Sequence, residues 1–307
     1  MLATVQISIW PSSNQPWADV LGVARYADDH GFHGVWVADH FMGSGGSPFT
    51  PAEQPTLEAG SLVAALAAAT ERVRLGTLVY GNSYRHPAVL ANMAATVDHV
   101  SGGRFTLGVG AGWQENEHDQ YGIELPPVRE RIDRFAEALE VIRGLLRQPT
   151  TTFAGEHYRL ADALSEPKPV QAPLPILVGA AGEQRMLRIV ARLADQWNCW
   201  STPDLFAHKS SVLDTWCERE GRDPASIWRS TQALVFLTDD DAKADELLGA
   251  VPRAAIGGTP GRLVDTLGRY AELGVDEFIV PDFTFGAMPQ KLEAFDRLTS
   301  EVFAQLH

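Results

Sequence analysis

Short runs rich in valine, isoleucine and leucine alternate with longer amphipathic segments along almost the whole chain. Each short run has the length and composition of a buried strand, and each longer segment is long enough for a helix. Such alternation is typical of βα units that build a parallel sheet. The pattern predicts eight strands, over residues 5–10, 34–39, 73–79, 104–110, 175–180, 194–200, 227–237 and 275–283.

The segments between these runs carry helix signals. Segments 17–31 and 259–274 end on Gly31 and Gly274, and glycine commonly follows the last turn of a helix. The clearest helix is 127–147, because apolar residues recur there every three or four positions. These apolar residues are Ile132, Phe135, Leu139, Ile142 and Leu146.

Eight strands in alternation with about as many helices predict an α/β fold of the (β/α)8 TIM-barrel type. A doubly wound open sheet is the alternative architecture. The alternation breaks near 149–175, which includes a proline-rich stretch, and near 238–258. Strands resume after each break, so we expect one barrel domain over 1–307 with these two excursions as insertions at its C-terminal face.

Composition and charge restrict the class of protein. The chain is 45% hydrophobic and 21% charged, an ordinary balance for a globular protein, and its formal net charge of −14 argues against nucleic acid or an anionic membrane as partner. Its two cysteines, Cys199 and Cys217, are expected to be reduced thiols. The N-terminus has no signal-peptide pattern, and no apolar run could span a bilayer. We therefore expect a cytoplasmic protein.

A carboxylate and an imidazole, Asp39 and His40, follow the second predicted strand directly. Active sites of parallel barrels lie at the carboxyl ends of the strands, so this pair is placed at the barrel mouth. The same dipeptide recurs as Asp98-His99, but at the end of a predicted helix, where the helix dipole favours a cation. Position therefore distinguishes the two pairs, and the first is the candidate for chemistry.

Small residues lie at the ends of strands four and five. Gly108, Gly110 and Gly112 lie at the end of strand four, and the run 179–182 (Gly-Ala-Ala-Gly) ends strand five, just before a predicted helix. Such residues let a ligand approach the backbone, and free N–H groups at a helix start can bind phosphate, although each signal alone could mark a turn. The chain has no G-x-G-x-x-G, nucleophile-elbow or P-loop motif.

An acidic cluster, 115–119, contains two glutamates, a histidine and an aspartate. No spacing typical of metal ligands recurs around it, so we expect no metal site and a solvated, partly helical segment. Within it, Asn116 and Glu117 are candidates to turn inward.

Taken together, the stretches "GVWVADHF", "VRLGTLVYGNSYRHPAVLANMAATVDHVSGGRFTLGVGAGWQENE" and "GTPGRLVDTLGRYAELGVDEFIV" resemble the bacterial-luciferase-like family over nearly the whole chain. The resemblance implies a (β/α)8 barrel, often dimeric, that binds FMN or the deazaflavin coenzyme F420 at its mouth. Asp-His-Phe after strand two is similar to the F420 branch, whereas the flavin monooxygenases more often show Glu-His.

The resemblance also implies roles for individual residues. His40 would exchange a proton beside the reactive ring, and Asp39 would orient His40 or bond to the polar edge of the ring. Strand three would carry a non-proline cis peptide at Leu78-Val79 against one face of the ring. The cofactor-binding residues implied are Asp39, His40, Thr77, Leu78, Val79, Gly110, Ala111, Gly112, Asn116, Gly179, Ala180, Ala181 and Gly182.

One departure from the family pattern concerns the substrate. Sugar-phosphate dehydrogenases of the family carry a glutamate where this chain has Trp113, so we expect a more apolar pocket, formed with Phe41 and Tyr84. The anionic tail of F420 has Arg85 and Arg129 as candidate partners.

The expected activity is hydride transfer between F420 and a small organic substrate, by a homodimer. The alternative is an FMN-dependent monooxygenase that uses a separate flavin reductase. A flavin-storage barrel and a metal-dependent hydrolase are the other hypotheses.

Overall fold

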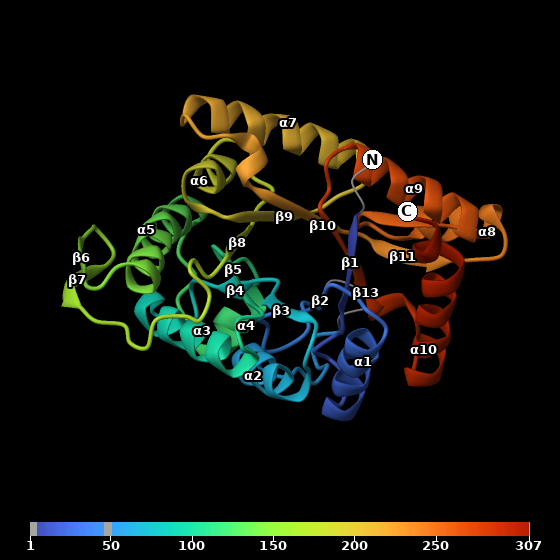
Figure 1. Cartoon of the computed structure of the whole chain (residues 1–307), viewed down its shortest axis with the longest axis horizontal. Coiled ribbons are helices and arrows are strands. Elements are labelled where there is room, and N and C mark those ends of the chain that lie inside the picture. Colours follow the sequence, from blue (N-terminus) through green and yellow to red (C-terminus); the bar gives the residue numbers. More distant parts are fainter. Residues whose placement is uncertain (1–4, 46–50, 307) are drawn as a thin grey trace.

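Parallel strands close into a barrel in the computed structural model, which describes residues 5–45 and 51–306 (Figure 1). The strand order is β3-β2-β1-β13-β10-β9-β8-β5-β4, and pairing of β3 with β5 closes the ring. The (β/α)8 prediction is therefore confirmed, and the open-sheet alternative was wrong. The barrel strands are β1 (Gln6–Trp10), β2 (Gly34–Val37), β3 (Arg74–Thr77), β4 (Tyr80–Gly81), β5 (Phe105–Gly110), β8 (Ile176–Gly179), β9 (Gln196–Trp200), β10 (Trp228–Gln232) and β13 (Glu277–Pro281).

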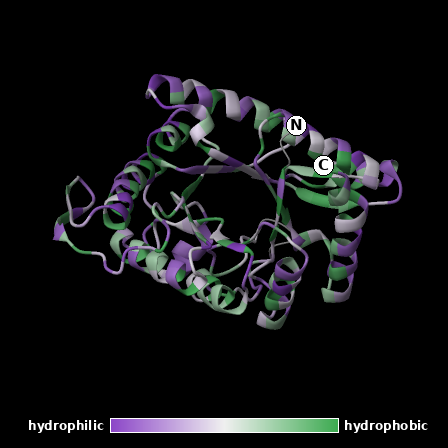
Figure 2. Cartoon of the chain, in the orientation of Figure 1, coloured by the Kyte–Doolittle hydropathy of each residue, from purple (hydrophilic) through white to green (hydrophobic). Residues whose placement is uncertain are grey.

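Helices surround the barrel, with hydrophilic residues concentrated on their outward faces (Figure 2). No described helix is both long and apolar enough to cross a membrane. The helices are α1 (Trp17–Asp29), α2 (Ala59–Ala69), α3 (Pro87–Ser101), α4 (Glu115–Tyr121), α5 (Val128–Arg147), α6 (Met186–Leu193), α7 (Pro203–Arg219), α8 (Asp241–Ala250), α9 (Pro260–Glu272) and α10 (Met288–Arg297).

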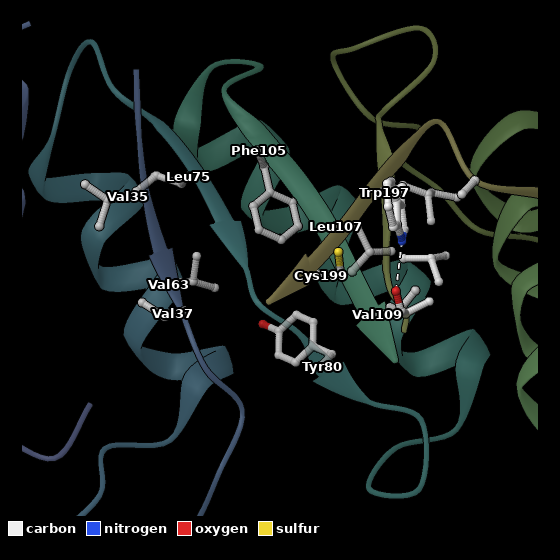
Figure 3. Packing of buried hydrophobic residues seen from close by; sticks show 14 of the residues in the cluster. Val35, Val37, Val63, Leu75, Tyr80, Phe105, Leu107, Val109, Trp197 and Cys199 are labelled. Carbon is white, nitrogen blue, oxygen red and sulfur yellow. Dashed lines mark hydrogen bonds between the residues drawn. The ribbon is translucent and has the colours of Figure 1, made fainter. Parts of the chain in front are cut away.

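The main hydrophobic core lies between the barrel and its helices (Figure 3). Alternate strand residues point outward into it because successive side chains of a strand face opposite sides. Among them, Val35 and Val37 come from β2, and Leu107 and Val109 from β5. The indole N–H of Trp197 is also satisfied here, by a 2.9 Å hydrogen bond to the carbonyl of Ala180.

The other strand face fills the inside of the barrel. The part of the barrel interior farther from the mouth is polar: the Glu277 carboxylate accepts hydrogen bonds from Ser8 (2.5 Å) and Trp36 (2.7 Å). Toward the mouth the filling becomes apolar, with a second cluster that includes Trp10, Leu177 and Ile279. The mouth therefore has an apolar floor.

The third barrel position is split between β3 and β4. The peptide bond between Leu78 and Val79, at the break, is cis, as the family resemblance implied. Neighbouring strands leave room for the displaced backbone: a Cβ added to Gly108 would lie 1.8 Å from the Thr77 carbonyl oxygen. A Cβ at Gly110 would lie 2.7 Å from Val79. These glycines are thus required by the break in strand three.

Both predicted excursions carry structure of their own. In the first, β6 (Thr151–Ala154) and β7 (Arg159–Ala163) form an antiparallel hairpin beyond α5 (Figure 1). In the second, α8 leads to β12 (Ala255–Gly258), which pairs in parallel with β11 (Leu234–Leu237).

The prediction of a single strand over 227–237 was wrong. The run is divided at the buried residue Ala233, so that β10 remains in the barrel and β11 joins β12 in a separate two-stranded sheet. The sequence of the run does not show this change of partner, because its polar first half and its apolar second half both form strands with buried residues.

Candidate active site

A histidine–carboxylate pair lies at the barrel mouth. Nδ1 of His40, just after β2, is 2.9 Å from Oε1 of Glu117, in the first turn of α4. An ionised carboxylate can only accept, so Nδ1 carries the proton in this contact. Nε2 of His40 has no hydrogen-bond partner among the described residues, and the side chain is 27% exposed. The imidazole is therefore oriented at one nitrogen and available at the other.

Glu117 is fully buried and has three donors around it. Besides His40, it accepts a 2.8 Å bond from the N–H of Phe41 and a hydrogen bond from the Tyr84 hydroxyl. Burial acts to raise the pKa of Glu117, but these donors outweigh it and hold that pKa below its ordinary value. Burial and the bond to Glu117 raise the pKa of Tyr84, which keeps its hydroxyl a donor.

The start of α4 also holds the loop after β2. The Gln114 side chain donates to the Met42 carbonyl (3.0 Å), and the Asn116 amide donates to the Gly43 carbonyl (2.8 Å). Together with Glu117, these bonds fix the backbone on which His40 stands. Asn116 and Glu117 thus turn inward, as the sequence suggested, and the Asn116 side chain is bonded to the loop after β2.

Asp39 points away from this pair into an ion-pair network. Both of its oxygens accept from the guanidinium of Arg85, at 2.6 and 3.0 Å, and one also accepts from the N–H of Gly81. Arg85 reaches Glu58 as well, at 2.5 Å. Burial acts to lower the pKa of Arg85, but the two carboxylates outweigh it and raise that pKa. The carboxylate that contacts the His40 imidazole is therefore that of Glu117, and Asp39 braces the mouth.

This network also bears on the predicted tail partners. The side chain of Arg85 is only 13% exposed and is occupied by two carboxylates, which leaves it unsuited to an anionic tail. Arg129 is exposed on α5.

The side chains of the acidic cluster 115–119 do not converge on a common metal-binding position. His118 is buried, with Nδ1 2.6 Å from the Gln114 carbonyl oxygen and Nε2 2.7 Å from the Ser83 hydroxyl. Glu115 and Asp119 are exposed. Within residues 5–45 and 51–306, no group of three or more histidine, cysteine or acidic side chains could hold a metal ion.

A cavity, here called the mouth cavity, opens beside His40. The ring of Trp113 stands at its edge, 5.5 Å from the His40 ring and nearly perpendicular to it, with 56% of the residue exposed. Phe41 and Tyr84, expected to share this pocket, pack on each other at 4.9 Å behind Glu117 instead. Described residues that line the cavity include Trp10, Ser12, Ala38, His40, Trp113, Arg253 and Phe283.

The small residues at the ends of β5 and β8 divide into those that contact Val79 and those that follow the strands. Gly110 and Gly179 face Val79, and Thr77 is buried with its hydroxyl bonded to the Gly108 carbonyl (2.8 Å). Gly112, just before α4, has a φ of +86°, a backbone conformation that favours glycine. The remaining residues of the predicted set directly follow these two strands: Ala111 follows β5, and 180–182 follow β8.

The family assignment follows from comparison with known proteins. The model of the family described as luciferase-like monooxygenase matches residues 1–287. The chain belongs to this family. It is accordingly a luciferase-like oxidoreductase, and the resemblance inferred from the sequence is confirmed.

Relatives within the luciferase-like family differ in activity. The uncharacterized protein Rv0953c of Mycobacterium tuberculosis is 34% identical over 275 residues, covering 84% of this chain and 86% of that protein. An F420-dependent glucose-6-phosphate dehydrogenase of Kineococcus radiotolerans is 33% identical over 73% of this chain and 65% of its own. A 4-hydroxyprotoasukamycin monooxygenase of Streptomyces nodosus subsp. asukaensis is 29% identical over 76% and 62%.

Solved structures confirm the luciferase-like fold. An F420-dependent secondary alcohol dehydrogenase, in complex with an F420-acetone adduct, superposes with a TM-score of 0.84 at 21% identity, over 98% of this chain and 99% of that one. At this identity the likeness shows the fold alone.

The mouth residues fit a flavin-type ring, the cofactor type named among these proteins. Such a ring needs an apolar seat and polar partners for its heteroatom edge. The floor around Trp10 and Leu78 supplies the seat. Two inward-facing groups, the indole N–H of Trp10 and the side-chain oxygen of Gln232, are buried without a hydrogen-bond partner in the described residues. Buried polar groups are normally paired, so both are available to a bound molecule.

Proposed function

We propose that this chain is an F420-dependent oxidoreductase that transfers a hydride between the deazaflavin and a small organic substrate. The observation that carries the proposal is the His40–Glu117 pair, whose free Nε2 faces the mouth of a luciferase-type barrel. The relatives named F420-dependent dehydrogenases support the choice of cofactor. The cofactor supplies a hydride donor or acceptor at its C5 carbon when bound.

His40 holds the proton that accompanies the hydride. Its Nε2 takes a proton from a substrate hydroxyl, or gives one to a carbonyl oxygen, according to the direction of transfer. The Glu117 carboxylate keeps Nδ1 protonated and stabilises the imidazolium that forms. The buried position of Glu117 strengthens this effect, because water does not screen the pair.

Other residues hold and shield the cofactor. The backbone of Leu78 and Val79 and the apolar floor around Trp10 would contact the cofactor ring, and the floor would exclude water from it. The N–H groups of Ala181 and Gly182 take part in no hydrogen bond among the described residues, and they precede α6. They are the donors we assign to the cofactor phosphate.

A second candidate is an FMN-dependent monooxygenase that receives reduced flavin from a reductase. It is favoured by the relative named 4-hydroxyprotoasukamycin monooxygenase, which matches over three quarters of this chain.

An equilibrium titration separates the two candidates. The purified protein is titrated with oxidised F420, oxidised FMN and their reduced forms, and binding is followed by absorbance and fluorescence. The proposal predicts saturable binding of F420 at least tenfold tighter than that of FMN. Tighter binding of FMN in both redox states would establish the monooxygenase candidate instead.

A further inference from the structure

One cation at the mouth has no counter-ion. Arg253 follows α8 and lines the mouth cavity that contains His40. Its guanidinium lies 5.1 Å from the centre of the Trp200 ring, and no carboxylate among the described residues pairs with it. Arg253 is an exposed residue, but partial desolvation of its guanidinium lowers its pKa, and no acidic group opposes this shift. An unpaired arginine beside a reactive histidine is notable in a chain of net charge −14.

The next cation along the mouth is already neutralised. Lys291 lies in an adjoining cavity, where its ammonium is 2.6 Å from a carboxylate oxygen of Asp282 and 2.8 Å from the Gln15 side-chain oxygen. Both members of that ion pair are buried. Of the described lysines and arginines that line these two adjoining cavities, Arg253 is therefore the one without a carboxylate partner.

The walls near Arg253 are aromatic. Trp10 lies 5.7 Å from Trp200 and 5.2 Å from Phe283, measured between ring centres, and Trp113 lines the same cavity. Aromatic walls favour a flat apolar body, which they contact by stacked or edge-to-face packing. The polar groups on this side, Ser12 and the unpartnered Trp10 N–H, are neutral.

We propose that the mouth cavity binds a substrate with a carboxylate on a flat, apolar or aromatic body. The carboxylate faces Arg253, the body lies between the indole rings of Trp10 and Trp113, and the reacting carbon points to His40. A guanidinium binds a carboxylate through two parallel N–H bonds, and the described lining of the cavity offers no second arginine or lysine to balance the further charge of a phosphate dianion. This inference rests on the proposed function only in taking His40 as the reacting end.

The fold explains how the arginine comes to the mouth. Division of the predicted strand at Ala233 sends β11 out of the barrel, and α8 and β12 complete the excursion. Arg253 stands on the turn between α8 and β12, so the insertion supplies a specificity residue to a site built by the barrel. Loops at this face commonly set the substrate of a barrel enzyme.

Calorimetric titration tests the proposal without turnover. The ligands are biphenyl-4-carboxylate and its uncharged carboxamide, and the protein is titrated with and without oxidised F420. Both arms compare an anion with its neutral isostere, so the result does not depend on which cofactor the enzyme uses. We expect the carboxylate to bind at least tenfold tighter than the amide.

Three variants assign the preference to Arg253. Arg253→Met should remove the difference between acid and amide, and Arg253→Lys should retain part of it. The matched control is Arg219→Met, because Arg219 also stacks on an indole, 5.0 Å from the Trp216 ring, but outside the mouth cavity. Equal binding of acid and amide to the wild type, no binding of either, or a full preference in Arg253→Met would overturn the proposal.

Discussion

Nδ1 of His40 lies 2.9 Å from a carboxylate oxygen of Glu117, although the two residues are 77 positions apart in the chain. The contact joins the end of β2 to the first turn of α4 and sets which imidazole nitrogen faces the mouth cavity. We propose that this contact makes His40 the proton-exchanging residue and Glu117 the residue that positions it.

Removal of the Glu117 charge should slow the chemical step. We expect Glu117→Gln to lower kcat about 100-fold, within the usual range for loss of acid–base assistance, because the amide cannot stabilise an imidazolium. The dissociation constant of F420 should change less than about threefold. Glu115→Gln is the control, since Glu115 lies in the same turn but is exposed. Steady-state kinetics in which both variants match the wild type would contradict the assignment.

The Asp39–Arg85 pair should matter to stability. Arg85→Met leaves two carboxylates, Asp39 and Glu58, without their shared cation, and loss of one partner of a buried pair costs about 3–5 kcal/mol. Urea denaturation should show this loss. Arg269→Met is the control, because both members of the Arg269–Asp204 pair are exposed, and such pairs contribute about 0–1 kcal/mol. Equal midpoints for the two variants would argue against a bracing role.

Gly108 should be intolerant of any side chain. An added Cβ meets the Thr77 carbonyl oxygen at 1.8 Å, and because that oxygen belongs to the backbone, Gly108→Ala must displace β3 or β5. We expect a strongly lowered melting temperature or loss of soluble protein. Gly268→Ala in α9, where nothing lies within 4 Å, should instead stabilise the protein by about 0.5–1 kcal/mol. A melting temperature of Gly108→Ala within a few degrees of the wild type would show that the strands can separate.

Asp28 should contribute stability that acid removes. It accepts hydrogen bonds from three consecutive backbone N–H groups, of Glu71, Arg72 and Val73, at 2.7–2.9 Å. Burial acts to raise the pKa of Asp28, but these donors outweigh it and lower that pKa. A depressed pKa stabilises the fold above the ordinary aspartate value of about 4, and this contribution is lost as the pH falls through the lowered value.

The test compares Asp28→Asn with the wild type across pH. We expect the variant to be less stable by about 1–3 kcal/mol at pH 7 and the difference to shrink below about pH 4. Asp29→Asn is the control, since the Asp29 side chain is 70% exposed. A difference between Asp28→Asn and wild type that grows on acidification would have the wrong sign.

The barrel could be predicted from the sequence because its signals are local. Strand runs, helix periodicity and terminal glycines each depend on neighbouring residues, and the parallel fold follows from their order. The cis bond at Leu78-Val79 has no such local signal and came from the family resemblance. The position of His40 at a strand end also followed from the fold class, because barrel chemistry lies at that face.

The partners within the site could not be predicted. Glu117 could be expected to turn inward, but its contact with His40 could not be, because only the folded α4 brings the two residues together. Asp39 adjoins His40 in sequence, but successive residues point to different sides. The Asp39 carboxylate therefore pairs with Arg85 and not with the His40 imidazole. The strand-end Gly110, expected to make room for a ligand, makes room for Val79. In each case the decisive contact joins segments that the sequence does not relate.

The central claim is that Nε2 of His40, oriented by Glu117, faces the reactive carbon of a deazaflavin seated against Val79. A crystal structure of the protein with oxidised F420 tests it most directly. We predict electron density for the ring between Val79 and His40, with Nε2 turned toward C5 and the phosphate near Gly182. A ring bound elsewhere on the barrel, or a His40 imidazole turned away from it, would contradict the account.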